Sequence, residues 1–108
     1  MTDPTIRQII QAMPSRFNPQ AAGSLDAVLQ FDISGEQGGH FFATIREGTC
    51  RLDEGSHTAP TLRLTMSDQT YVDMVMGRLT GQQAFFTRKL RYTGPINLAI
   101  KLHTLFTR

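Results

Sequence analysis

Residue types that can bind a metal or act as a nucleophile are few in this chain and lie far apart. The three histidines, His40, His57 and His103, fall in three different expected elements, and Cys50 is close to none of them in sequence. A zinc site gathers about four such ligands at characteristic spacings, so we expect no metal site. Cys50 alternates with Leu52 on the expected inner side of a strand, which favours a small core residue over a nucleophile.

Two other patterns in the chain could suggest chemistry. Asp53 and Glu54 are adjacent, and because neighbours on a strand point to opposite faces, they make a poor acid–base pair. Gly35, Gly38 and Gly39 could belong to a phosphate loop, but no Lys-Ser or Lys-Thr pair follows them, which favours a hairpin. No nucleophile lies in a recognisable elbow. The sequence therefore predicts a protein that is not an enzyme and that has no catalytic residue and no cofactor.

Length and composition restrict the class of protein further. The chain has 108 residues, of which 40% are hydrophobic, with eleven basic and nine acidic residues. These values are typical of one soluble domain with one core, so we expect a single domain over residues 1–108. No apolar run approaches the roughly 20 residues of a membrane span, and no secretory signal is visible. A lone cysteine fits a reducing compartment, and we expect a cytoplasmic protein.

The charge is distributed unevenly along the chain. Up to Glu54 there are four arginines and seven acids, whereas from Gly55 onward there are seven basic residues and two acids. The densest basic group is Arg88-Lys89-Arg91. A solvated surface is one interpretation of this group, and contact with anionic lipid head groups or an acyl-carrier phosphate is the other. Because the excess is small, we expect no nucleic-acid partner.

The elements that must position these residues follow from hydrophobic periodicity. A first helix is expected to begin at Asp3 and Pro4, which suit its N-cap and first position, and to stop at Pro14. Its apolar stripe has the spacing of one helix face: Ile6, Ile9, Ile10 and Met13. Period-two alternation then predicts four strands joined by short turns, which implies an antiparallel sheet with one solvated face: 27–34, 41–46, 49–54 and 62–66.

The second half of the chain is mostly helical by the same criteria. Ser67 can cap a helix with an apolar stripe from Tyr71 to Leu79. Gly77 and Gly81 bracket the expected break before a second short helix, which should end near Phe86. Residues 88–93 could form a fifth strand. The last helix, from residue 96, is apolar over far more than the usual third of its surface. Such a helix is either deeply buried or faces something apolar that is not protein.

Three stretches of the chain resemble the sterol carrier protein 2 family of lipid-binding domains. They are LTMSD at 64–68, GRL at 77–79 with QQAFF at 82–86, and KLRYTG at 89–94 leading into LAIKL at 98–102. They occur in the family's order and, with the strands, cover most of the chain. The resemblance implies an α+β fold with a twisted, mainly antiparallel five-stranded sheet. Helices would cover one face of that sheet, and a hydrophobic tunnel would lie between the two.

Site residues are carried over from the family position by position. Gln82 matches a position near the tunnel where the family often has glutamine; it could orient a polar head group or lie at the surface. The tunnel wall would come from apolar residues of the strands, the middle helices and the last helix: Phe31, Ile33, Phe41, Met76, Leu79, Phe85, Phe86, Ile96, Ile100 and Leu102.

The function implied by the resemblance is non-catalytic binding and intracellular transfer of fatty acids, fatty acyl-CoA, sterol-like or isoprenoid molecules. Transient contact with a membrane surface or with a partner enzyme would accompany it. The chain ends without the tripeptide of a peroxisomal address, and it looks like a free-standing bacterial member. Three alternatives remain open. The first is an accessory protein that presents an intermediate to the enzymes of a lipid or quinone biosynthetic complex. The second is an enzyme that acts on a bound acyl thioester, which would require a residue of strongly shifted pKa beside the cavity, and the third is a structural domain whose cavity is filled by side chains.

Overall fold

The N-terminal helix begins and ends later than its sequence suggests. The computed structural model describes residues 5–106, so Asp3 and Pro4 lie outside the described residues. Helix α1 spans Ile6–Arg16 and is capped by a reciprocal pair of hydrogen bonds between Thr5 and Gln8. The prediction that Pro14 ends this helix is wrong. Pro14 lies on the exposed side of the last turn, where only one backbone hydrogen bond is lost, and the helix continues to Arg16.

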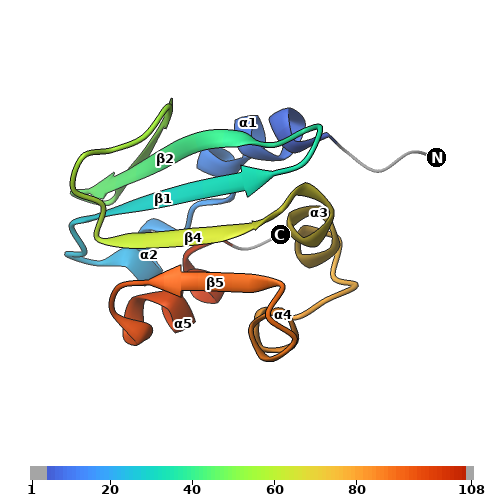
Figure 1. Cartoon of the computed structure of the whole chain (residues 1–108). Coiled ribbons are helices and arrows are strands. Elements are labelled where there is room, and N and C mark those ends of the chain that lie inside the picture. The colour runs from blue at the N-terminus through green and yellow to red at the C-terminus, as the bar shows by residue number, and fades with distance from the viewer. Residues whose placement is uncertain (1–4, 107–108) are drawn as a thin grey trace.

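The five strands form one mixed sheet in the order β3-β2-β1-β4-β5 (Figure 1). Three of the four pairings are antiparallel, but β1 and β4 run parallel. The expectation that short turns join antiparallel strands throughout is therefore wrong at one place, the connection from β3 to β4. That connection has to pass over β2 and β1 to bring β4 to the far side of β1. The strands are β1 (Ala27–Ser34), β2 (Gly39–Arg46), β3 (Thr49–Glu54), β4 (Leu62–Ser67) and β5 (Leu90–Thr93).

The segment 55–61, which we call the strap, makes this crossing on the outer face of the sheet. It leaves β3 with the Gly55 N–H bonded to the His40 carbonyl (2.8 Å) and reaches β4 with the Thr61 N–H bonded to the Val28 carbonyl (2.9 Å). Between these points the His57 ring meets the outward-facing Phe42 ring edge-on at 5.2 Å. The strap therefore covers part of a sheet face that the sequence pattern assigns to solvent.

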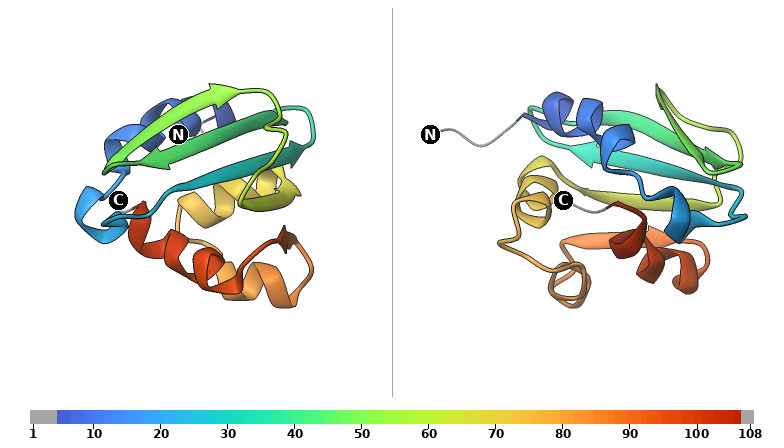
Figure 2. Two further views of the ribbon diagram at one scale, coloured as in Figure 1. Left: turned by 90° about the vertical axis from the view of Figure 1, so that its left-hand side faces the viewer. Right: turned by 180° about the vertical axis from the view of Figure 1, so that it is seen from behind.

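The helices cover the opposite, inner face of the sheet, as the view from behind shows (Figure 2). They are α1, α2 (Pro19–Ala22), α3 (Asp68–Val75), α4 (Gly81–Phe86) and α5 (Ile96–Leu105). Inward residues of the three central strands are almost completely buried beneath them: Leu29, Phe31, Ala43, Ile45, Leu62 and Leu64. The α+β fold, with its five-stranded, mostly antiparallel sheet, is thus confirmed.

Helix α3 is shorter than its apolar stripe suggests. It ends at Val75, and Gly77 then takes a φ of 81°, a conformation that favours glycine and that turns the chain away from the helix. Leu79 consequently lies outside α3, in the turn before α4. Strand β5 also begins later than expected, at Leu90, because Arg88 has a φ of 62° that no strand residue adopts.

Candidate functional site

The candidate site begins in the core, at an aromatic cluster between the sheet and α3. The Phe31 and Phe41 rings stack with centroids 5.1 Å apart, and the Tyr71 ring lies 6.1 and 6.3 Å from them. All three side chains are buried, as is Ile33 on the same face of β1. The structure therefore brings the predicted strand residues of the site together, under α3.

Tyr71 is a member of this cluster that the sequence analysis assigned only to a helix stripe. Burial raises the pKa of its hydroxyl well above the ordinary value, and the positive charge of Arg16 at the end of α1 opposes part of that rise. The hydroxyl gives the aromatic cluster a polar end on the α1 side. The signal for it in the sequence is the one tyrosine on an otherwise aliphatic stripe, because a buried tyrosine combines apolar area with a polar tip.

The other predicted site residues lie at the surface or near it. Five are large hydrophobic side chains with substantial exposure: Met76 (42%), Phe85 (44%), Phe86 (79%), Ile96 (55%) and Ile100 (69%). Leu79 and Leu102 are half-buried, and Gln82 is exposed. The predicted set is therefore divided between a closed core and an open apolar end, and its role in lipid binding stays a prediction.

Hydrogen bonds at both ends of helix α4 hold Phe85 and Phe86 in place at this open end. Thr80 and Gln83 form a capping box at its start, and Ala84 is fully buried beside β5. The Lys89 N–H donates to the Ala84 carbonyl at 2.8 Å, which ties the helix to the turn before β5. Phe85 then lies 5.9 Å from the Phe86 ring and 5.3 Å from the Tyr92 ring of β5.

Helix α5 is anchored at its end and exposed near its start. The Asn18 N–H donates to the Leu105 carbonyl at 2.8 Å, and the Phe17 and Phe106 rings are 5.9 Å apart. At the other end Pro95 offers no side-chain cap. Of its hydrophobic residues, Leu98 and Leu105 are buried, whereas Ile96 and Ile100, one turn apart, face solvent. The long apolar surface expected for the last helix is thus only partly covered by protein.

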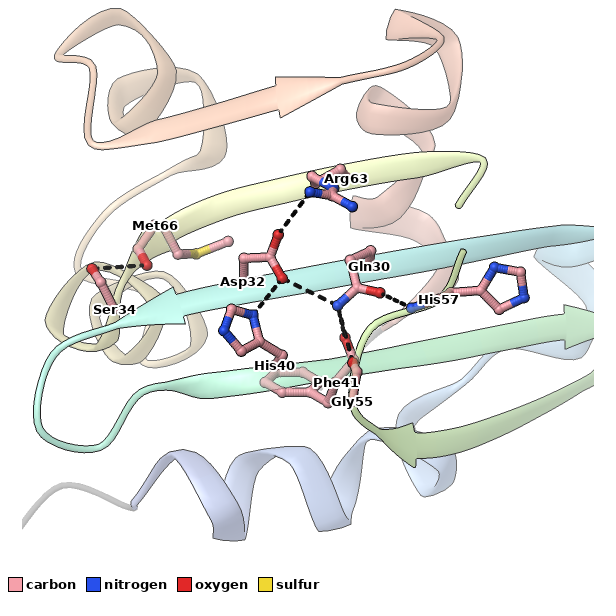
Figure 3. A network of polar contacts seen from close by, with 9 residues as sticks. All are labelled: Gln30, Asp32, Ser34, His40, Phe41, Gly55, His57, Arg63 and Met66. Carbon is pink, nitrogen blue, oxygen red and sulfur yellow. Dashed lines mark hydrogen bonds and ion pairs between the residues drawn. The ribbon is translucent and has the colours of Figure 1, made fainter. Parts of the chain in front are cut away.

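A polar network occupies the outer face of the sheet, where the strap crosses it (Figure 3). Gln30 is completely buried there, and its side-chain amide donates to Asp32, to the Phe41 carbonyl and to the Gly55 carbonyl at 3.1–3.3 Å. Its carbonyl oxygen accepts the His57 N–H at 2.8 Å. The strap is thus attached through Gln30, whose buried amide nitrogen and carbonyl oxygen both have hydrogen-bond partners.

The Asp32 carboxylate links this network to two exposed side chains. His40 Nδ1 lies 2.8 Å from Asp32 Oδ1, and Arg63 Nη1 lies 3.6 Å from Asp32 Oδ2. A carboxylate that orients a histidine is one part of a nucleophile-activating set. The nearby Ser34 hydroxyl, however, donates to the Met66 carbonyl at 3.5 Å. The network as a whole stabilises the sheet and the strap.

Metal-binding and thiol chemistry find little support in residues 5–106. Among the side chains that the structure describes, which leave out His103, no three His, Cys, Asp or Glu residues gather as a metal site would require. Burial raises the pKa of the half-buried Cys50 thiol to about 11, so almost no thiolate forms at neutral pH. Helices α1 and α5, with 11 and 10 residues, are about half as long as a membrane-spanning helix, and no described helix could cross a bilayer.

One groove of about 280 Å³ lies between α1 and the adjoining ends of β2 and β3. Its walls mix apolar residues such as Ile10 with charged ones, and the Arg7 guanidinium and Glu54 carboxylate, both part of the lining, are 3.6 Å apart. Phe41 is the one predicted site residue in this lining. The groove is therefore separate from the open apolar end at α4 and α5.

A mixed five-stranded sheet of this order, with helices on one face and apolar side chains reaching from the core to an open end, defines a class of small lipid-binding domains. The model of the SCP-2 sterol transfer family matches residues 6–107. The chain belongs to that family.

Similar proteins include larger ones. Hydroxysteroid dehydrogenase-like protein 2 of Rattus norvegicus is 28% identical over 103 residues, which are 94% of this chain and 20% of that protein. The chain thus spans about a fifth to a quarter of the length of such curated relatives. Palmitated SCP2L2 from Aedes aegypti has a TM-score of 0.77 at 20% identity, covering 92% of this chain and 91% of that one. The sec-alkylsulfatase Pisa1 from Pseudomonas sp. has a TM-score of 0.83 at 14% identity, covering 97% and 17%. These structural likenesses show the fold alone.

Proposed function

We propose that the chain is a non-catalytic domain that binds lipids and transfers them within the cell. The observation that carries this proposal is the continuation of apolar side chains from the core that contains Phe31, Phe41 and Tyr71 to the surface. Half-buried Tyr92 and Leu102 pack against that core, and the Tyr92 ring lies 5.3 Å from the partly exposed Phe85 ring of α4. Membership of a sterol transfer family supports it. The ligands would be fatty acids, fatty acyl-CoA, sterol-like or isoprenoid molecules, bound in a tunnel between the sheet and the helices.

The free energy of such binding comes from burial of apolar surface. Each buried methylene contributes roughly 0.8 kcal/mol, so an acyl chain with about twelve of them gains on the order of 10 kcal/mol before losses. Ordering of the chain and of the protein removes much of this gain. Micromolar affinity with loose selectivity follows, because apolar contacts discriminate weakly between similar ligands.

The eleven predicted residues would have different roles in this site. Phe31, Ile33 and Phe41 would line the inner end, whereas the residues of α4, α5 and the preceding turn would contact the ligand near the surface. Gln82, exposed in the first turn of α4, would meet only a head group that remains at the mouth. A carrier of this kind must also contact a membrane surface transiently. A free-standing bacterial protein of the cytoplasm, with residues 1–108 as one domain, is the setting that we propose.

The first test is native mass spectrometry of freshly purified protein, followed by organic extraction and lipid analysis. A co-purified acyl chain, sterol-like molecule or quinone would support the carrier function and identify the ligand class. Titration with a fluorescent fatty acid should then show affinity about tenfold weaker for Phe85→Ser. Phe42→Ser, which removes a ring from the outer face, is the matched control and should bind normally. A protein that is empty and also fails to bind the fatty acid contradicts the proposal.

A second candidate function is that of an accessory protein that presents a bound intermediate to partner enzymes. The observation that favours it is the exposure of Phe86 and Ile100, because a contiguous exposed apolar surface often marks an interaction site. Affinity purification distinguishes the two functions. A stoichiometric enzyme partner that is lost in Phe86→Ser supports the accessory role, and a carrier needs no such complex.

A further inference from the structure

The surface formed by α4, the turn at 87–89 and the exposed side of α5 combines apolar and basic side chains. We call it the α4–α5 face, and its defining residues are Phe86, Ile96, Ile100, Arg88, Lys89 and Lys101. All six are exposed. Figure 1 shows α4 before the start of β5 and α5 after its end, both along the sheet edge that β5 forms.

This face lies in a part of the chain that has no acidic residue. Asp73 is the last acid, and the 35 residues from Met74 to Arg108 contain basic residues only among their charged types. Within residues 5–106, Arg88, Lys89 and Lys101 take part in no ion pair. Three arginines of the first half of the chain are paired, in contrast: Arg7, Arg46 and Arg51 each lie within 4.0 Å of a carboxylate. The positive charge of the α4–α5 face is thus left for a partner.

The turn after α4 has the ordinary geometry of a helix end. Arg88, with a φ of 62°, follows the C-cap Thr87, and the Arg88 and Lys89 N–H groups donate to the Phe85 and Ala84 carbonyls at 3.1 and 2.8 Å. These bonds fix the backbone of two cationic residues shortly after Phe86, which is 79% exposed.

We infer that the α4–α5 face docks on the surface of a bilayer that contains anionic lipids. Phenylalanine and isoleucine enter the boundary between head groups and acyl chains, while lysine and arginine remain among anionic head groups. The inference rests on the proposed function in one respect: a lipid carrier must meet membranes to collect and release its cargo. The α4–α5 face would be the surface that meets the membrane, and the lipids that it meets would be negatively charged.

A second copy of the chain suits this face less well than a bilayer does. Seated across a two-fold axis, it would bring the same unpaired cations together, which like-charge repulsion opposes. The apolar stripe of α1 offers no alternative membrane contact, because Ile6, Ile9 and Met13 are buried in the core. The α4–α5 face is therefore the surface whose exposed apolar side chains and free charge match an anionic bilayer.

The test uses the lack of tryptophan in the chain. Phe86→Trp introduces a fluorophore at the face, and its emission should shift to the blue with vesicles of phosphatidylcholine containing roughly one-third phosphatidylglycerol. Phosphatidylcholine alone should cause little shift, and added salt should reverse it. Phe42→Trp, on the outer face of the sheet, is the control reporter and should not respond.

Charge-removal variants then test the basic residues. In the Phe86→Trp background, Arg88→Gln, Lys89→Gln and Lys101→Gln together should weaken vesicle partitioning at least about tenfold. The matched control, Arg7→Gln with Arg46→Gln and Arg51→Gln, removes the same charge elsewhere and should change it less than about twofold. Equal losses in the two triple variants would overturn the assignment, as would the absence of a blue shift with anionic vesicles. A blue shift that grows with protein concentration, without vesicles, would show that a second copy covers the face instead.

A parallel titration separates failure of this inference from failure of the proposed function. The fluorescent fatty acid is added without vesicles to the unsubstituted protein and to the Phe42→Trp control. Normal fatty-acid binding by these two proteins, with no vesicle binding by Phe86→Trp, would reject the membrane face and leave the carrier function standing. Loss of fatty-acid binding in the unsubstituted protein would instead reject the carrier function.

Discussion

On the outer side of the sheet the strap closes over Gln30, whereas beyond β5 the helices α4 and α5 leave Phe86 and Ile100 in solvent. In the first region a buried polar amide has all its partners and the surrounding strands are tightly paired. In the second, apolar side chains lack cover and basic ones lack counter-ions. The two regions therefore have different roles. Hydrogen bonds hold the sheet and the strap together, whereas the end of the molecule at α4 and α5 keeps apolar and basic side chains available for a ligand or a membrane surface.

The connections at the two regions differ in the same way. The strap is attached through Gly55, His57 and Thr61, each with a hydrogen bond to β1 or β2. Helix α5 is anchored at Leu105 but begins after Pro95 without a side-chain cap. Local opening costs least where few buried contacts and few caps are lost, so we expect the start of α5 to open before the strap does.

The largest difference between the two regions should be in the free energy of unfolding that is lost when one aliphatic side chain in each is truncated to alanine. Leu29 is completely buried, and Leu29→Ala should lower the free energy of unfolding by about 3 kcal/mol, because it leaves a cavity in the core. Ile100 is 69% exposed, and Ile100→Ala should cost less than about 0.5 kcal/mol. Urea unfolding measures both. Similar losses for the two variants would remove the distinction between the regions.

Thiol reactivity should show the next largest contrast. The pKa of Cys50 rises from 9.0 to about 11 through burial, so at pH 8 iodoacetamide should modify the folded protein about 100-fold more slowly than the unfolded chain. The raised pKa means that only the unfolded thiol ionises between pH 9 and 11. The thiol's contribution to stability is therefore complete below pH 9 and is lost as the pH rises through that window.

A cysteine placed on the α4–α5 face is the control for this experiment. Ile100→Cys in a Cys50→Ser background should react within about tenfold of the unfolded rate, because position 100 is exposed. Slow reaction at both positions would mean that the face is covered in solution.

The smallest expected difference is in the stability lost on substituting a buried and an exposed glutamine. Gln30→Ala leaves the His57 N–H and two carbonyls of the strap region without their partner, and should cost about 2 kcal/mol. Gln82→Ala, at an exposed position of α4, should cost a few tenths of a kcal/mol. Hydrogen exchange at the His57 amide should accelerate in Gln30→Ala alone. A normal exchange rate there would show that the strap does not depend on this side chain.

The strands were predictable from sequence because period-two alternation reports which face of a strand is buried. Leu29, Phe31 and Ile33 are all inward, as their spacing indicates. The same alternation carries no information on neighbours, so the parallel pairing of β1 with β4 could not be predicted. The alternation also placed Gln30 on the solvated face. The strap buries this residue, and the alternation could not indicate that because the strap lies some 25 residues further along the chain.

The site was less predictable than the fold. Apolar residues of a closed core and of a lipid site are the same types, and the excess of them in α5 indicates only that something apolar is nearby. The structure separates buried Leu98 from exposed Ile96 and Ile100 on that helix. The break between α3 and α4 was predictable from Gly77 and Gly81, but the apolar spacing wrongly assigned Leu79 to the helix before that break.

The parallel pairing of β1 with β4 also determines when a nascent chain can complete its sheet. β2 follows β1 directly and can pair at once, but the other edge of β1 stays open until β3, the strap and β4 have been synthesised. Until then a central strand carrying Leu29 and Phe31 presents unpaired backbone groups, which is the form in which chains associate wrongly. Ribosome-bound chains that end before Leu62 should therefore be the most prone to aggregate. Once β4 is available, it pairs with the open edge of β1 and removes the exposed backbone groups.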